Sequence, residues 1–401
     1  MSIPSPKNVT PVSKDKLDTR SDNEIAHQLR TFSPPTESEK NVWGYWHTGF
    51  DSMPPWTQRN VINWVRRFGS SWTVRVVDSV PGSPNNISRF VENSFFPDAF
   101  NVNRLTGSYA GVHSADLVRL PLLYLYGGIW MDVGTLLIRS LDDIWGLLKD
   151  PETPYEMAAM TIPLRRDEAI MTNSFLASVR HNPFIHRWHR LFFTIWEHSS
   201  DCVGAHAHPL LSHLRLYSAP GSEANEPSIP SSDKEMSDYL AHMLCAERVR
   251  DLVDTDDGFD GRAFYEHKIF LLPILREGCY LQRQTGWDGP LQLRILQTSL
   301  NILENEREDE FNRARDLVHD LLQNTTLIKL GHGPKGVTTP WLADLWDEPR
   351  YRDADHAPGT FAAYLRKMSL EFNQTRKLNP LDVSVSEKLW HAGLLEPCGL
   401  N

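Results

Sequence analysis

The segment at residues 125–137, LYGGIWMDVGTLL, constrains the fold of this chain more than any other stretch. A helical pattern over residues 113–126 stops at two glycines, which readily adopt the backbone conformations that close a helix. The apolar run over residues 129–138 then predicts a buried strand. That strand contains a single acid, Asp132, in surroundings where an unpaired charge is unfavourable.

Residues 41–78 predict the opening of an α/β sheet. Residues 41–50 and 72–78 are apolar runs with strand character, and residues 54–69 form a helical face that begins at two prolines and ends at a glycine. Strands that alternate with helices are typical of α/β folds. We therefore expect a mixed, mostly parallel sheet flanked by helices.

The same alternation without an internal repeat predicts one α/β domain over residues 39–401, with helical insertions and a C-terminal helical segment. A long charged helix over residues 300–323 and a late strand with a glycine-rich turn over residues 325–333 belong to its second half. Residues 1–38 are polar, with scattered proline and serine and no periodicity. We expect them to form a disordered arm.

Composition indicates a globular chain, since 40% of its 401 residues are hydrophobic and 23% are charged. The net charge of −10 argues against a simple nucleic-acid coat, which needs a cationic surface. The sequence has no apolar run long enough to span a bilayer and no apolar signal core at its start, so we expect a cytoplasmic protein that binds no membrane. Its four cysteines are far apart and form no zinc or disulfide pattern.

Three segments resemble the capsular-polysaccharide-synthesis branch of the glycosyltransferases that use a DxD-type sugar motif. They cover residues 42–64, 113–137 and 327–333, and the specific signal is a Ser-x-Asp-x-x-Arg helix, then Tyr-Gly-Gly, then an acid on a strand. The resemblance implies a GT-A-like α/β fold. It also implies that the first strand and helix hold a nucleotide, and that the acid motif holds a metal and the sugar diphosphate.

A paired-acid motif needs its acids because the diphosphate leaving group gains negative charge, which a divalent cation with oxygen ligands stabilises. In this chain the pattern is Asp132-Val133-Gly134, so the second acid is missing. One carboxylate with waters can still hold a metal weakly. Asp132 is therefore the candidate catalytic residue, and also the metal ligand if the chain is a glycosyltransferase.

The missing acid and the absence of an anchor favour a second resemblance, to the fungal arginine-containing cyclodipeptide synthases. That resemblance implies synthesis of a cyclic Arg-Xaa dipeptide in a secondary-metabolite pathway, with arginyl-tRNA and a second aminoacyl-tRNA as partners and no cofactor. The alternative is a soluble glycosyltransferase that moves a sugar from a nucleotide sugar to a small-molecule or glycan acceptor, using Mn or Mg. A pseudo-enzyme that binds a nucleotide or a partner protein is a third hypothesis.

Further candidate substrate-binding residues come from the resembling segments. Asp116 and Arg119 lie three apart on one helix face, where they can pair with each other or border the nucleotide site. Trp46 lies in the first predicted strand, and Trp is a common pocket lining. His332 lies between two glycines, where it can contact a phosphate or a carbonyl, although a lone loop histidine is more often incidental.

An acidic loop at residues 254–261, DTDDGFDG, is the last candidate. Because carboxylates bind guanidinium in bidentate geometry, the loop can form a cation or guanidinium site. The alternative is an exposed turn in which aspartate and glycine are present because they favour turn conformations of the backbone. Its four acids are Asp254, Asp256, Asp257 and Asp260.

Overall fold

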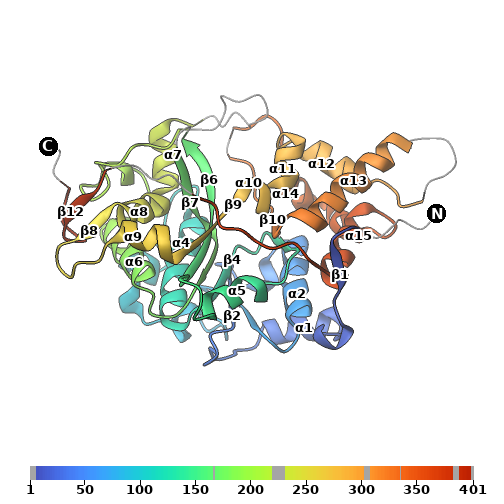
Figure 1. Cartoon of the computed structure of the whole chain (residues 1–401), viewed down its shortest axis with the longest axis horizontal. Helices are drawn as coiled ribbons and strands as arrows, with labels where there is room; N and C mark the ends of the chain where they lie inside the picture. Colours follow the sequence, from blue (N-terminus) through green and yellow to red (C-terminus); the bar gives the residue numbers. More distant parts are fainter. Residues whose placement is uncertain are drawn as a thin grey trace.

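The computed structural model describes residues 6–165, 168–218, 231–301, 308–334, 336–382 and 388–398. Within these residues the central sheet has six strands, and Figure 1 shows it between two groups of helices. Strand β7 is antiparallel to both of its neighbours, and the other pairs are parallel. In spatial order the strands are β3 (Thr73–Val77), β2 (Asn41–Tyr45), β4 (Gly128–Met131), β7 (Glu168–Ser178), β6 (Met157–Arg165) and β9 (Ile269–Pro273). The predicted mixed, mostly parallel α/β sheet is confirmed.

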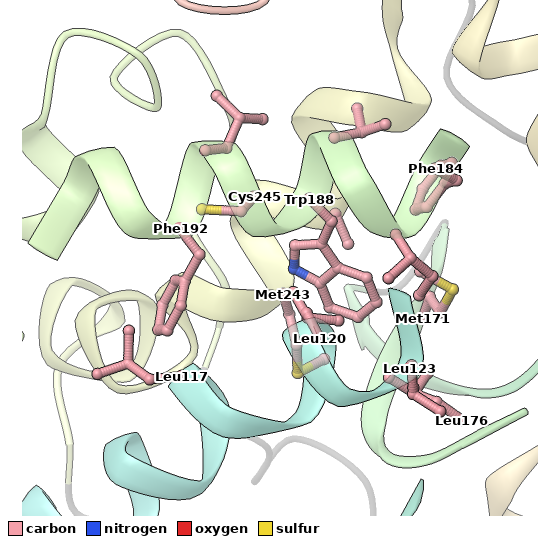
Figure 2. Packing of buried hydrophobic residues seen from close by; sticks show 14 of the residues in the cluster. Leu117, Leu120, Leu123, Met171, Leu176, Phe184, Trp188, Phe192, Met243 and Cys245 are labelled. Atoms are coloured by element: carbon pink, nitrogen blue, oxygen red, sulfur yellow. The ribbon is translucent and has the colours of Figure 1, made fainter. Parts of the chain in front are cut away.

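One face of the sheet packs against α4 (Ala110–Tyr126), α6 (Pro183–Trp196) and α8 (Ala241–Arg250). Figure 2 shows the leucines of α4 opposite Trp188 and Phe192 of α6, with side chains of β7 and α8 around them. Trp188 is fully buried, so its burial alone contributes on the order of 2–3 kcal/mol. This packing fixes α4 against the sheet.

The other face packs against α1 (Asp22–Leu29), α2 (Pro55–Phe68) and α5 (Asp142–Lys149). Successive side chains of a strand point to opposite faces, so Trp130 enters the first cluster while its neighbours Ile129 and Met131 enter the second. Both faces of β4 are therefore buried, as its continuous apolar sequence requires.

A third cluster joins the C-terminal helices, which Figure 1 shows gathered to one side of the sheet. A short antiparallel pair, β5 (Thr135–Leu137) with β10 (Leu327–Lys329), connects them to the strand-β4 region. The cluster is built from α11 (Tyr280–Thr285), α12 (Gly289–Leu296), α13 (Glu308–Asn324), α14 (Leu342–Asp347) and α15 (Phe361–Glu371).

The shorter elements are α3, α7, α9 and α10, with strands β8, β11 and β12. Among the described residues, no helix is long and apolar enough to cross a bilayer. The bounds of these elements are α3 (Asp98–Asn101), α7 (Asp233–Tyr239), α9 (Gly261–Lys268), α10 (Ile274–Glu277), β8 (Leu252–Asp254), β11 (Phe372–Gln374) and β12 (Trp390–Ala392).

Where we expected a disordered arm over residues 1–38, the structure has strand β1 (Val9–Pro11) paired with β11, and helix α1. Helix α1 begins at a capping box in which Ser21 and Glu24 bond each other's main-chain N–H groups. Ile25 and Leu29, one helical turn apart, are buried. These local signals distinguish the segment from a disordered one; residues 1–5 lie outside the described residues.

The single strand expected over residues 129–138 is instead two strands. Strand β4 ends at Met131, and the main-chain N–H of Thr135 donates to the carbonyl of Asp132 at 3.0 Å, which closes a turn. Strand β5 then leaves the central sheet to pair with β10. The break places Asp132 in a turn at the end of a central strand.

Candidate active site at the end of strand β4

Asp132 lies just beyond the carboxyl end of β4. Because β2, β3 and β4 are parallel, their carboxyl ends meet at one edge, which is where open α/β sheets bind ligands. The main-chain N–H of Asp132 donates to the carbonyl of Ser174 at 3.1 Å, and the indole N–H of Trp130 donates to its carboxylate at 3.0 Å. The expectation of a buried carboxylate was wrong. The side chain is 33% exposed because the strand ends immediately before it.

Two cations flank this carboxylate. Nη1 of Arg119 lies 3.8 Å from one carboxylate oxygen of Asp132, and Nζ of Lys329 lies 3.8 Å from the other. The Arg119 side chain is 3% exposed, whereas that of Lys329 is 34% exposed. The acid that the sequence singled out is therefore paired on both sides by residues of the chain itself.

Arg119 is held in place by contacts to all of its nitrogens. Its Nη2 lies 2.6 Å from a carboxylate oxygen of Asp116, Nε donates to the carbonyl of Ala115 at 3.3 Å, and Nη1 donates to the carbonyl of Asn173. Its guanidinium carbon lies 4.9 Å from the centre of the Trp130 ring. Arg119 thus connects α4, β4 and β7 beneath Asp132 and has little freedom to bind a ligand.

A second, buried layer supports this arginine. The side-chain amide of Asn173 donates to Asp116 at 2.9 Å and lies 3.1 Å from Nδ1 of His242. Burial raises the pKa of Asp116, and the nearby Arg119 opposes that rise. Burial also lowers the pKa of His242, so this imidazole is neutral and its Nδ1 accepts from the amide. Sequence reasoning missed Asn173 and His242, because neither residue belongs to a motif.

Gly134 occupies the position of the missing second acid, and the structure shows why no acid is there. A Cβ atom at this position would lie 2.2 Å from the carbonyl oxygen of Leu330, whose main-chain N–H donates to the Gly134 carbonyl at 2.9 Å. Within the described part of the chain, no three His, Cys, Asp or Glu side chains are grouped so as to hold a metal ion. The residues present do not fit the paired-acid metal site that the resemblance implied.

His332 lies two residues beyond Leu330 and is held by Asp347 of α14. Its Nε2 lies 2.7 Å from one carboxylate oxygen of Asp347, whose other oxygen accepts a 2.7 Å hydrogen bond from the indole N–H of Trp56. The hydrogen bond to Asp347 raises the pKa of His332. His332 therefore carries positive charge over a wider pH range than a free histidine.

Replacing Asp347 by asparagine is expected to lower the pKa of His332, because the partner that favours its charged form is lost. The stability contributed by the wild-type pair is present below the ordinary histidine pKa and is lost as the pH rises through the raised one. The variant should thus lose more stability at about pH 5 than at about pH 8. An NMR titration of His332 and urea melts at both pH values test this; an unchanged titration midpoint contradicts it.

Trp46 follows the last residue of β2, at the same edge of the sheet as Asp132. Its main-chain N–H donates to the carbonyl of Val77 at 3.0 Å, and its ring centre lies 6.2 Å from that of His47. The ring is half-buried. The structure therefore places Trp46 beside the carboxyl ends of the parallel strands.

The acidic loop is placed elsewhere and has structural partners. Asp254 lies 3.3 Å from the guanidinium of Arg187, and Asp257 pairs with the same arginine. Asp260 caps α9 by accepting from the main-chain N–H of Ala263 at 2.9 Å. Asp256, between them, is exposed. The loop does bind a guanidinium, but one supplied by the chain itself, and Figure 1 shows β8 and α9 toward the other side of the molecule from β10.

A mostly parallel α/β sheet with a half-buried, cation-flanked acid beyond strand β4 is consistent with a glycosyltransferase-like scaffold. Residues 2–204 match the family model described as "Capsular polysaccharide synthesis protein". The chain belongs to this family.

Relatives align along almost the whole chain. An O-glycosyltransferase of Annulohypoxylon truncatum, braB, is 45% identical over 96% of this chain and 92% of its own length. The O-glycosyltransferase PaGT of Phomopsis amygdali is 45% identical over 98% and 97%, and the glycosyltransferase afumC of Aspergillus fumigatus is 44% identical over 96% and 98%. A transferase is the class that these relatives support.

The expectation of an arginine-containing cyclodipeptide synthase was wrong. It rested on the missing second acid and the absence of an anchor, yet relatives that match 92–98% of their own length with this chain are named glycosyltransferases. Arginyl-tRNA and a second aminoacyl-tRNA are set aside as partners together with it. The absence of an acid at position 134 has a steric cause and does not indicate aminoacyl chemistry.

Proposed function

We propose that this protein is an O-glycosyltransferase that moves a sugar from a nucleotide-sugar donor to a hydroxyl group of a small-molecule acceptor. The observation that carries the proposal is the 44–45% identity, over nearly the full chain, to proteins named as glycosyltransferases. The partly exposed Asp132 at the carboxyl edge of the parallel strands supports it. A role in secondary metabolism is part of this proposal.

In the proposed reaction the bond between the anomeric carbon and the diphosphate oxygen breaks, and its electron pair leaves with the nucleoside diphosphate. The acceptor oxygen forms a bond to the anomeric carbon, and its proton is released to solvent. Asp132 accepts hydrogen bonds from hydroxyls of the donor sugar, since an ionised carboxylate offers two acceptor oxygens. Trp46 contacts the nucleotide from the end of β2.

Replacing Asp132 by asparagine is expected to lower kcat/KM for sugar transfer by at least about 100-fold, because a preorganised charged group at the reacting sugar is lost. The asparagine is nearly isosteric, so the melting temperature should stay close to that of the wild type. Asp316→Asn on α13, an exposed acid with 68% side-chain exposure, is the matched control and should keep full activity. Equal rates for Asp132→Asn and Asp316→Asn contradict the assignment.

Mass spectrometry tests the reaction itself. The purified protein is incubated with each of several nucleotide sugars and a fungal metabolite extract, and products heavier by one sugar residue are sought together with released nucleoside diphosphate. We expect such products with the wild type and not with Asp132→Asn. If no donor yields a sugar-bearing product, the proposed function is wrong.

A further inference from the structure

We propose that Lys329 supplies the positive charge at the leaving diphosphate that a divalent cation supplies in paired-acid sites, so that this chain binds its donor without a metal ion. The inference rests on the proposed function and names the group that binds the diphosphate. It comes from three features of the structure. These are the position of the lysine, the close contact that excludes a side chain at Gly134, and the difference between Arg119 and Lys329 in the N–H donors that they can offer to a ligand.

Strand β10 delivers the lysine. In the antiparallel register, Lys329 lies opposite Thr135, the first residue of β5, which follows the Asp132 turn directly. This register places Nζ 3.8 Å from Asp132. Two further main-chain contacts fix the residue: its N–H donates to the carbonyl of Gly278 at 2.7 Å, and its carbonyl accepts from the Gln282 amide at 2.6 Å.

Leu330, the residue that follows β10, leaves no room for a second acid at position 134. The hydrogen bond between Leu330 and Gly134 brings the two backbones so close that the carbonyl oxygen of Leu330 fills the place of a Cβ atom at position 134. A paired-acid site balances two carboxylates against a dication. Here Arg119 is balanced by Asp116. Lys329 is balanced by Asp132, so the site is neutral with neither the second acid nor the metal.

Of the two flanking cations, Lys329 is the one able to bind a ligand. The nitrogens of Arg119 all contact protein atoms, and the side chain is buried. The Lys329 side chain is 34% exposed, and its Nζ lies 3.8 Å from Asp132, which is an ion pair beyond hydrogen-bonding distance. Three N–H donors are therefore available for phosphate oxygens, which lysine binds as a compact charge.

Lys329 acts through its positive charge in the proposed step. As the bond to the anomeric carbon breaks, the electron pair moves onto the diphosphate oxygen, and the ammonium stabilises the charge that develops there. Arg119 acts on Asp132 and not on the substrate, so it is a positioning residue. No proton or metal passes between protein and donor in this step.

Calorimetric binding of UDP, GDP, dTDP and ADP, each measured in excess EDTA and again with Mn²⁺, tests the proposal. We expect one of these nucleotides to bind in EDTA with an affinity within about twofold of that in Mn²⁺. Lys329→Met should weaken this binding about tenfold or more, because a hydrogen bond to a charged group is lost. Lys329→Arg should retain most of it. Lys367→Met, an exposed lysine on α15, is the control and should bind as the wild type does.

The outcomes separate the two proposals. If a nucleotide binds only with Mn²⁺, or if Lys329→Met binds as tightly as Lys367→Met, this inference is overturned while the proposed function stands. If none of the four nucleotides binds under either condition, the proposed function fails, and this inference fails with it. Circular dichroism and melting curves confirm that each variant is folded, and Lys329→Gln replaces the methionine variant if that one is not.

Discussion

Replacing Arg119 by methionine is expected to lower the free energy of unfolding by about 3–5 kcal/mol, because one partner of a buried ion pair is removed and the other stays buried. Asp116 is 3% exposed and, of its described partners, would keep the Asn173 amide, 2.9 Å away. Urea denaturation monitored by circular dichroism measures the loss. The matched control is Arg350→Met, which breaks an exposed pair with Glu348 and should change stability by less than about 0.5 kcal/mol.

The loss should depend on pH, with a definite sign. Burial already raises the pKa of Asp116, and removing Arg119 raises it further. In the folded variant the Asp116 carboxyl then binds its proton more firmly than it does in the unfolded chain. The stability of the variant therefore falls as the pH rises from the ordinary aspartate pKa of about 3.9 through the raised pKa of Asp116. The role assigned to the Arg119–Asp116 pair is contradicted if Arg119→Met loses as little stability as Arg350→Met. It is also contradicted if the loss of stability becomes smaller as the pH rises.

Replacing Gly134 by aspartate, which recreates a paired-acid spacing, is expected to destabilise the protein by about 3 kcal/mol rather than create a metal site. A side chain there must displace the backbone of Leu330, because its Cβ atom would lie 2.2 Å from the Leu330 carbonyl oxygen. That displacement breaks the β5–β10 pair and moves Lys329 away from Asp132. Thermal and urea melts, with and without Mn²⁺, measure the effect.

The control for this variant is Gly146→Ala in α5. A Cβ atom at Gly146 meets no atom within 4 Å, and the residue is exposed in a helix. Alanine there should raise stability by about 0.5–1 kcal/mol. If the Gly134→Asp variant is as stable as the wild type and gains stability from Mn²⁺, the close approach of β10 is not what excludes the acid.

Elements defined by local pattern could be predicted closely. The helix expected over residues 54–69 is α2, Pro55–Phe68, and the strand expected over residues 72–78 is β3, Thr73–Val77. In these segments the periodicity of apolar residues, the prolines and the glycine cap all agree. The helix expected to end at the two glycines is α4, which ends at Tyr126, although it begins at Ala110, before the Ser114 cap that the sequence suggested.

What could not be predicted depends on contacts between distant segments. The partial exposure of Asp132 follows from the pairing of β5 with β10, and no sequence pattern near residue 132 predicts that β10 is the partner of β5. Lys329 lay inside a segment that resembles the family, but no local pattern connects its ammonium to an acid almost two hundred residues earlier. The guanidinium for the acidic loop was likewise predicted to be a substrate, and it is Arg187 of the chain itself.

The pairing of β1 with β11 has a consequence for how this protein is made. The main-chain N–H of Thr375 donates to the carbonyl of Asn8 at 3.0 Å, across 367 residues of sequence. At a synthesis rate of about 5–20 residues per second, β1 remains unpaired for tens of seconds before the ribosome has synthesised its partner strand, β11. Strand β5 waits in the same way for β10. The nascent chain thus exposes unpaired strand edges through most of its translation, and completion of the Asp132 site is among the last events of biosynthesis.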